Sequence, residues 1–200
     1  MKPLLQSIVN ARAHNTPKLR HICIGNSSAD MDSVVGSMLM SHLKSNDSFK
    51  YSPVIFCPKN ELPYRIEIMQ HLSRFGMTQE WLHENVFFKE DLMSDTLDAV
   101  ESVSLVDFNE LPKELHSILS PRVHHIIDHH VDNGLYTSSL KSKKIQLIGS
   151  AVTLVIEEMK HANITFDSEI AMFASAPLLL DSYNFNHNLE GSKWTQEDAD

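Results

Sequence analysis

The sequence has 200 residues, and its 17 Lys and Arg residues against 26 Asp and Glu residues give a formal net charge of −9. That balance argues against nonspecific binding to nucleic acid or to an anionic membrane surface, because both require a basic protein face. The sequence also contains no run of about 18 apolar residues, so we expect no membrane span.

The first 19 residues are predicted to form an N-terminal helix or extension ahead of the main domain. One interpretation is an amphipathic helix over about 4–13. The alternative is a mitochondrial transit peptide, because residues 1–29 contain no acid and several basic residues, Lys2, Arg12, Lys18 and Arg20. We favour the helix and a cytoplasmic location, with a mitochondrial location as the alternative.

Short apolar runs bounded by turn-forming residues predict strands at 21–25, 52–57, 86–89, 102–106, 123–127 and 145–148. Apolar residues at helical spacing predict helices at about 32–44, 63–75, 78–84, 150–160 and 167–180, with Pro63 in a first turn and Ser150 as a cap. Because strands alternate with helices, we expect an α/β fold over residues 20–200, with a mostly parallel sheet and helices on both faces.

Acidic residues and histidines gather where these apolar segments end. The ligands of open α/β sheets bind outside the carboxyl ends of the strands, so we expect segments far apart in sequence to deliver these side chains to one edge of the sheet. The residues are Asn26, Asp30 and Asp32 after the first strand, Asp107 after a later strand, Asp128, His129 and His130 after the next, and Asp181 after the last apolar stretch.

Carboxylates and histidines without cysteine suit Mn²⁺, Mg²⁺ or Co²⁺ better than a structural zinc site. Several carboxylates indicate two ions, which at about 4 Å apart can activate a water and support displacement at phosphorus. Each residue also has an ordinary alternative. Asp30 and Asp32 are typical of a cap or turn, and Asp107 is compatible with a solvent-facing strand end. Of the adjacent His129 and His130, only one is expected to ligate the same ion.

The motifs also resemble a known family. Gly25-Asn26-Ser27-Ser28-Ala29-Asp30-Met31-Asp32-Ser33 is similar to the first motif of the DHH superfamily of phosphohydrolases, and Asp128-His129-His130 is similar to the motif that names it. Val106-Asp107, Gly149-Ser150-Ala151-Val152-Thr153 and Leu180-Asp181-Ser182 resemble further motifs, in the family's order. The resemblance implies a Rossmann-like DHH domain.

The resemblance implies a role for each matched position. Asp30 and Asp107 would hold one ion, and Asp32, Asp107, His129 and Asp181 would hold the other, with Asp107 bridging. His130 would face the phosphate and assist the leaving group, and Asp128 would support the histidines from behind.

Asn26 and the segment Asn60-Glu61-Leu62-Pro63-Tyr64-Arg65 are similar to the exopolyphosphatase and prune-like branch, since the related inorganic pyrophosphatases carry His at the position of Asn26. An amide in place of an imidazole favours Mg²⁺ relative to softer ions. Arg65 is a candidate phosphate clamp, and Ser150 could help to hold a phosphate through nearby amides. A weaker candidate for substrate contact is His187.

The activity implied is metal-dependent hydrolysis of phosphoanhydride bonds, with inorganic polyphosphate as the favoured substrate and pyrophosphate next. One alternative is a phosphodiesterase acting on cyclic or short nucleotides. Relatives carry a second, DHHA2-type domain that supplies basic residues, and we expect it to be absent from this chain. A further alternative is therefore a metal-binding interaction module with a protein partner or a dimer.

Overall fold

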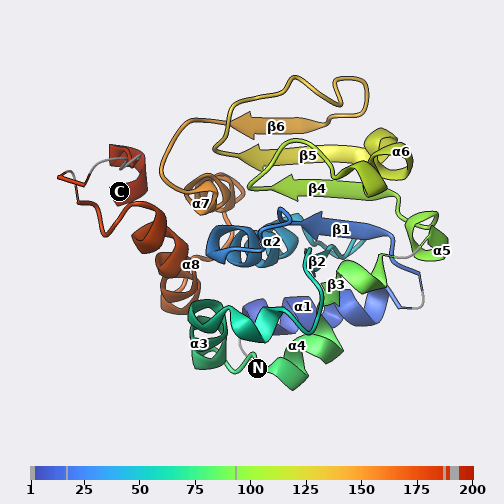
Figure 1. The fold of residues 1–200 in the computed structure, drawn as a ribbon, viewed down its shortest axis with the longest axis horizontal. Helices are drawn as coiled ribbons and strands as arrows, with labels where there is room; N and C mark the ends of the chain where they lie inside the picture. The colour runs from blue at the N-terminus through green and yellow to red at the C-terminus, as the bar shows by residue number, and fades with distance from the viewer. Residues whose placement is uncertain (1–2, 17, 93, 187, 190–193) are drawn as a thin grey trace.

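The computed structural model of the chain describes residues 3–16, 18–92, 94–186, 188–189 and 194–200. Its centre is a six-stranded parallel sheet in the order β3-β2-β1-β4-β5-β6 (Figure 1). The strands are β1 (His21–Ile24), β2 (Ser52–Ile55), β3 (Phe87–Phe88), β4 (Ser102–Val106), β5 (Val123–Asp128) and β6 (Ser142–Ile145). This architecture confirms the predicted α/β class.

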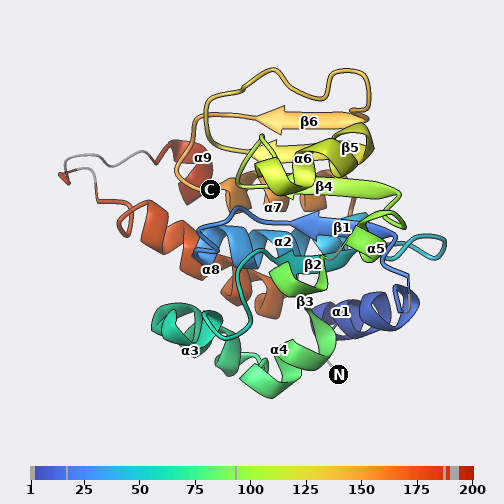
Figure 2. The ribbon, with the colours of Figure 1, turned by 45° about the vertical axis from the view of Figure 1, so that its right-hand side comes forward.

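Helices cover both faces of the sheet. Successive strand residues point to opposite faces, and in β1 the side chain of Cys23 joins one buried cluster while Ile22 and Ile24 join another. The first cluster includes residues of α1 (Pro3–His14), α2 (Met31–Lys44), α3 (Ile66–Arg74), α4 (Gln79–Asn85), α7 (Ala151–His161) and α8 (Ser168–Asp181). The second includes residues of α5 (Ser94–Leu97) and α6 (Lys113–Leu119), so α6 and α7 lie on opposite sides of the sheet (Figure 2).

The strand order reverses between β1 and β4. From β1 the chain adds β2 and β3 on one side, and it then returns to pair β4 with the other side of β1. The loops that leave β1 and β4 therefore diverge, and a crevice between such loops is the usual ligand site of doubly wound sheets. Asn26 follows β1 and Asp107 follows β4, so this topology brings both to the same place.

Two predicted elements differ from the structure. The strand predicted at 145–148 lies at Ser142–Ile145, because pairing with β5 ends where Ile145 lies opposite Asp128. It is an edge strand with an exposed Lys143, so its sequence lacks the apolar run that signals a buried strand. The helix predicted at 63–75 is a 3₁₀ turn, Leu62–Tyr64, followed by α3, with Arg65 between them in a non-helical conformation.

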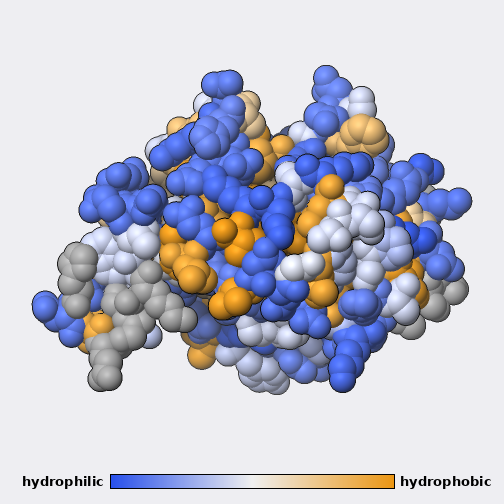
Figure 3. All heavy atoms as spheres, turned by 90° about the horizontal axis from the view of Figure 1, so that it is seen from above, coloured by the Kyte–Doolittle hydropathy of each residue, from blue (hydrophilic) through white to orange (hydrophobic). Residues whose placement is uncertain are grey.

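Three short helices escaped prediction, namely α5, α6 and α9 (Gln196–Ala199), because each is too short to show a clear apolar period. Seen from above β6, the surface is mainly hydrophilic, with apolar side chains exposed in patches between the polar ones (Figure 3). Val131 and Leu147 are among the exposed large apolar residues. No helix in the described part of the chain is long and apolar enough to cross a bilayer.

Candidate metal centre

The loop after β1 packs tightly against the first turn of α2. A Cβ atom on Gly25 would lie 2.7 Å from the carbonyl oxygen of Ser33, so only glycine allows this approach. Asp30 caps α2 by accepting a hydrogen bond from the amide of Ser33 at 3.0 Å, and its other oxygen accepts one from Ser28 Oγ at 2.6 Å. The cap interpretation of Asp30 is therefore confirmed, and Asp30 is exposed.

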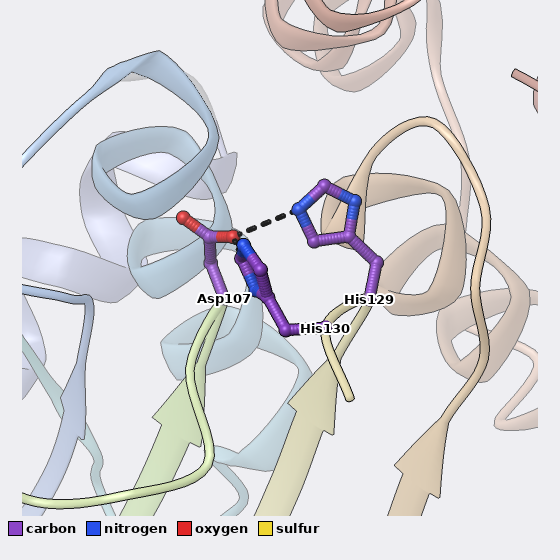
Figure 4. Close-up of side chains that lie close together, drawn as sticks. All are labelled: Asp107, His129 and His130. Carbon is purple, nitrogen blue, oxygen red and sulfur yellow. Dashed lines mark ion pairs between the residues drawn. The ribbon is translucent and has the colours of Figure 1, made fainter. Parts of the chain in front are cut away.

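Asp107 lies at the centre of the site and is only 2% exposed, which excludes the solvent-facing alternative. Its φ of 66° places it in the left-handed region, an uncommon conformation for a residue with a side chain. One carboxylate oxygen, Oδ2, accepts hydrogen bonds from Asn26 Nδ2 at 2.8 Å and from Ser33 Oγ at 2.7 Å. The other, Oδ1, lies 3.1 Å from His129 Nε2 (Figure 4).

Asp128 ends β5 and orients His130. It is fully buried, and its Oδ1 accepts hydrogen bonds from the backbone amides of His129 and His130 and lies 2.8 Å from His130 Nδ1. Its Oδ2 accepts a hydrogen bond of 2.5 Å from Asn109 Nδ2. Burial acts to raise the pKa of Asp128, but the hydrogen bonds from His130 and Asn109 outweigh it and lower the pKa. Asp128 is therefore an anion that holds the His130 ring by Nδ1.

His129 presents its other ring nitrogen. Its Nδ1 lies 3.1 Å from the carbonyl oxygen of Ile148, which can only accept, so Nδ1 carries a proton and Nε2 faces Asp107. The rings of His129 and His130 stand nearly perpendicular, at 80°. Ligand atoms of Asp107, His129 and His130 all lie within 4.8 Å of one another, the spacing that a metal ion could bridge.

Asp32 lies next to His129 and is 3% exposed. Its carboxylate accepts hydrogen bonds from Ser150 Oγ at 2.6 Å and from the amides of Ala151 at 2.6 Å and Val152 at 3.1 Å, and its Oδ2 is 3.8 Å from His129 Nε2. The helix-capping role predicted for Ser150 is confirmed. Its buried hydroxyl serves Asp32, so any contact between Ser150 and substrate remains a prediction.

Of the remaining predicted residues that the structure describes, Asp181 interacts with the other carboxylates of the site and Arg65 contacts the loop after β1. Asp181 is the last residue of α8, and burial together with the charges of Asp32 and Asp30 raises its pKa to about 8. Arg65 donates hydrogen bonds from Nη2 and Nε to the carbonyl oxygen of Ser28 at 2.8 and 3.2 Å, so it braces the loop after β1. His187 lies outside the described residues.

The carboxylates of the site repel one another. Burial is the main cause that raises the pKa of Asp107 to about 7, and Asp32 and Asp30 raise it further against the hydrogen bond from His129. Burial also raises the pKa of Asp32, against its hydrogen bonds from α7. Burial lowers the pKa of His129, but Asp107 and Asp32 outweigh it and raise that pKa to about 9. A divalent cation would relieve this excess of negative charge, and the oxygen and imidazole donors suit Mg²⁺ or Mn²⁺.

Three residues of the site were given no role in the sequence analysis. Ser33 and Asn109 hold Asp107 and Asp128 respectively, and each follows a recognised motif residue closely enough to have been considered. The third, Asp198, is 48 residues or more from its partners Gly149 and Ser150 in the sequence, and no local signal pointed to it.

Similar proteins were found in both sequence and structure comparisons, whereas no family model matches the chain. The chain is 26% identical over 187 residues to the exopolyphosphatase PRUNE1 of Mus musculus, covering 88% of this chain and 40% of that protein. It is 22% identical over 164 residues to a probable manganese-dependent inorganic pyrophosphatase of Staphylococcus carnosus, covering 80% of this chain and 47% of that protein.

Among solved structures, an exopolyphosphatase-related protein from Bacteroides fragilis matches with a TM-score of 0.60 at 14% identity, covering 92% of this chain and 52% of that one. The structural match shows that the chain shares the fold of this exopolyphosphatase-related protein, and the names of the sequence relatives agree with the resemblance to the DHH superfamily. The chain spans less than half the length of the curated relatives that it matches.

Proposed function

We propose that the chain forms the metal-binding part of a hydrolase of phosphoanhydride bonds that releases terminal phosphate from inorganic polyphosphate, with pyrophosphate as the next substrate. The observation that carries this proposal is the group of mutually repelling carboxylates around His129. Asp107 and Asp181 have pKa values raised to about 7 and about 8. A site with that charge is suited to divalent cations, through which a polyanionic substrate can approach an acidic protein.

The resemblance to the DHH superfamily implies two metal ions, and we propose the same ligands for this chain. They are Asp30, Asp32, Asp107, His129 and Asp181. When bound, such ions supply charge neutralisation at phosphorus and a water of lowered pKa. Mg²⁺ and Mn²⁺ are the proposed ions, with Co²⁺ as a possible substitute. The name of the Staphylococcus carnosus relative, a manganese-dependent pyrophosphatase, supports a divalent cation in this fold.

His130 is proposed to act on the phosphate or the leaving group. Its Nδ1 is held at 2.8 Å from Asp128 Oδ1, so Nε2 is left for substrate, and its side chain is 55% exposed. The hydrogen bond with Asp128 is the main cause that raises the pKa of His130. The raised pKa favours the cationic form of His130, which can donate a proton or a hydrogen bond to an oxygen that gains negative charge.

Arg65 is proposed to contact a phosphate once substrate is present. It already lies at the loop after β1, where both of its hydrogen bonds reach the Ser28 carbonyl oxygen. Exchange of a neutral carbonyl for an anionic phosphate oxygen would strengthen both hydrogen bonds.

The test is phosphate release from long polyphosphate and from pyrophosphate, with Mg²⁺ and with Mn²⁺. We expect the parent chain to release phosphate, the Asp107→Asn variant to release none, and an Asp47→Asn variant at an exposed position outside the site to behave like the parent. Equal release by the parent and the Asp107→Asn variant would contradict the assigned site. If neither substrate is cleaved while Mn²⁺ still binds, the metal centre stands and the hydrolase proposal fails for this chain.

A second candidate function is a phosphodiesterase acting on cyclic or short nucleotides. A cavity of about 490 Å³ beside His130 favours it, because its lining includes Phe108, Glu110 and Val131. No Lys or Arg is among the described residues that line this cavity, so a neutral organic group suits it better than further phosphates. Cleavage of nucleotides without cleavage of polyphosphate would favour this candidate.

A further inference from the structure

At the start of α7, four successive backbone amides donate hydrogen bonds to two carboxylates, two amides to each. The amides of Gly149 and Ser150 donate to Asp198 at 2.8 and 3.3 Å, and those of Ala151 and Val152 donate to Asp32 at 2.6 and 3.1 Å. The first amides of a helix have no backbone partner within it, so the two carboxylates satisfy such donors, and the amide of Val152 is shared with Ser150 Oγ at 3.2 Å. Asp32 and Asp198 are therefore held by one short turn.

Asp198 is built into this turn. It lies in α9 and is 6% exposed, and it also accepts hydrogen bonds from Thr153 Oγ1 at 2.6 Å and from the amide of Thr195 at 2.8 Å. A Cβ atom on Gly149 would lie 2.9 Å from Asp198 Oδ2 and 3.1 Å from Trp194 Cα. The segment that carries Asp198 thus lies directly on the turn, and only glycine at position 149 leaves room for it.

The same turn orients two residues of the metal centre. Ser150 Oγ and the amides that follow it bind Asp32. One residue before Gly149, the carbonyl oxygen of Ile148 lies 3.1 Å from His129 Nδ1 and so directs Nε2 toward Asp107. A rotation of the peptide units between Ile148 and Ala151 would displace both Asp32 and His129.

We propose that Asp198 is a positioning residue for the metal centre, which fixes the turn at 148–152 and through it the carboxylate of Asp32 and the ring of His129. The inference rests on the proposed function only in taking Asp32 and His129 as metal ligands. Asp198 itself does not touch the ion or the substrate. Its effect passes through backbone amides, because those are the groups that it binds.

The test is the Asp198→Asn variant of the full chain, measured by Mn²⁺ titration with electron paramagnetic resonance and by amide NMR of the metal-free protein. An amide group would turn a donor toward Gly149 or Ser150, so the turn should loosen. We expect Mn²⁺ affinity to fall about tenfold, as for other residues that orient metal ligands, and the amides of Ala151 and Val152 to exchange faster with solvent. The conservative Asp198→Glu variant should recover part of the affinity.

The matched control is Asp167→Ala, which removes a carboxylate cap from α8, where Asp167 accepts a hydrogen bond from the amide of Ile170 at 2.9 Å. It should lower the melting temperature without changing Mn²⁺ affinity or the signals of Ala151 and Val152. If Asp198→Asn does not fold, the Thr153→Val variant tests the proposal in its place. It deletes a single hydrogen bond to Asp198 and should weaken Mn²⁺ binding severalfold.

The proposal is overturned if folded Asp198→Asn, or Thr153→Val in its place, keeps the parent's Mn²⁺ affinity and the parent's Ala151 and Val152 amide exchange. A parent chain that binds no Mn²⁺ would instead contradict the metal centre of the proposed function. In that case the amide signals, which require no metal, still decide whether Asp198 holds the turn that binds Asp32.

Discussion

The carboxylate of Asp107 uses its two oxygens differently: Oδ2 accepts hydrogen bonds from Asn26 and Ser33, while Oδ1 lies 3.1 Å from Nε2 of His129. The hydrogen bonds from Asn26 and Ser33 fix the orientation of the carboxylate and leave Oδ1 on the side of His129. Asp107 can therefore approach a cation through Oδ1 without losing the contacts that hold it in place.

The first prediction concerns Asp107→Asn, which should abolish metal binding and stabilise the metal-free protein at pH 8. Asn tolerates the left-handed conformation at φ 66°, so the backbone is preserved. Its amide oxygen can accept from Asn26 and Ser33, and its amide nitrogen can donate to neutral His129.

The pH range over which Asp107→Asn gains stability follows from the raised pKa of Asp107. A carboxyl titrates near pH 4 in an unfolded chain and Asp107 titrates at about 7 in the fold. Stability from this group is therefore fully present below about pH 4 and is lost as the pH rises through 7. The gain in melting temperature of Asp107→Asn over the parent should grow between these values and level off above them. A variant that melts below the metal-free parent at pH 8 would contradict the prediction.

The second prediction is that Mn²⁺ binding releases a proton from His129. Its pKa of about 9 makes it cationic at pH 7.5, whereas a metal ligand must be neutral. Affinity should rise more than tenfold per pH unit from pH 7.5 to about 8, where Asp181 with its pKa of about 8 also loses a proton, then about tenfold per unit to pH 9, and flatten above that. Calorimetry at pH 7.5 in buffers of different ionisation enthalpy measures the release directly. Binding that is independent of buffer and pH would exclude His129 as a ligand that loses its proton.

The third prediction concerns Asn109→Ala, which should impair catalysis more than metal binding. Asn109 donates to Asp128 and to the carbonyl oxygen of Val131, and it accepts from the amide of Asn133. Loss of these hydrogen bonds within a buried region should cost about 1–3 kcal/mol of unfolding free energy. The melting temperature should then fall by about 2–4 °C per kcal/mol.

Because Asp128 holds His130 by its ring nitrogen, the turnover rate in the phosphate-release assay should drop at least several-fold, while Mn²⁺ affinity changes little. Asn133→Ala is the control, since it keeps the backbone amide that binds Asn109 and removes only a side chain that contacts Glu110. Unchanged turnover in Asn109→Ala would show that the orientation of His130 does not depend on this amide.

The fourth prediction is that Asn26→His shifts metal preference from Mg²⁺ toward Mn²⁺. The amide of Asn26 now contacts Asp107 through Nδ2 and accepts from the amide and hydroxyl of Ser28 through Oδ1. An imidazole nitrogen at this position is a softer donor, which Mg²⁺ accepts less readily than Mn²⁺. Titrations with each ion should show a higher ratio of Mn²⁺ to Mg²⁺ affinity in the variant. An unchanged ratio would place Asn26 outside the coordination of the ion.

Much of the fold followed from local sequence patterns. The strand at 102–106 and the caps supplied by Asp30 and Ser150 were predictable because alternation and capping act over a few residues. The position of β6 was not, because an edge strand with an exposed Lys143 and a half-buried Lys144 lacks the buried pattern on which the prediction relied, and its register depends on pairing with β5.

By itself the sequence determined which polar residues gather, because parallel strands end at one edge of a sheet and each acid or histidine follows a strand or an apolar helix. Only the tertiary structure decided how they are used. It turned one oxygen of Asp107 toward His129, bound both oxygens of Asp32 to the start of α7, and placed Asp198 on the same turn. Asp198 and Gly149 are 49 residues apart. A hydrogen bond across that distance forms only after the intervening chain has packed, so no local pattern of residues records it.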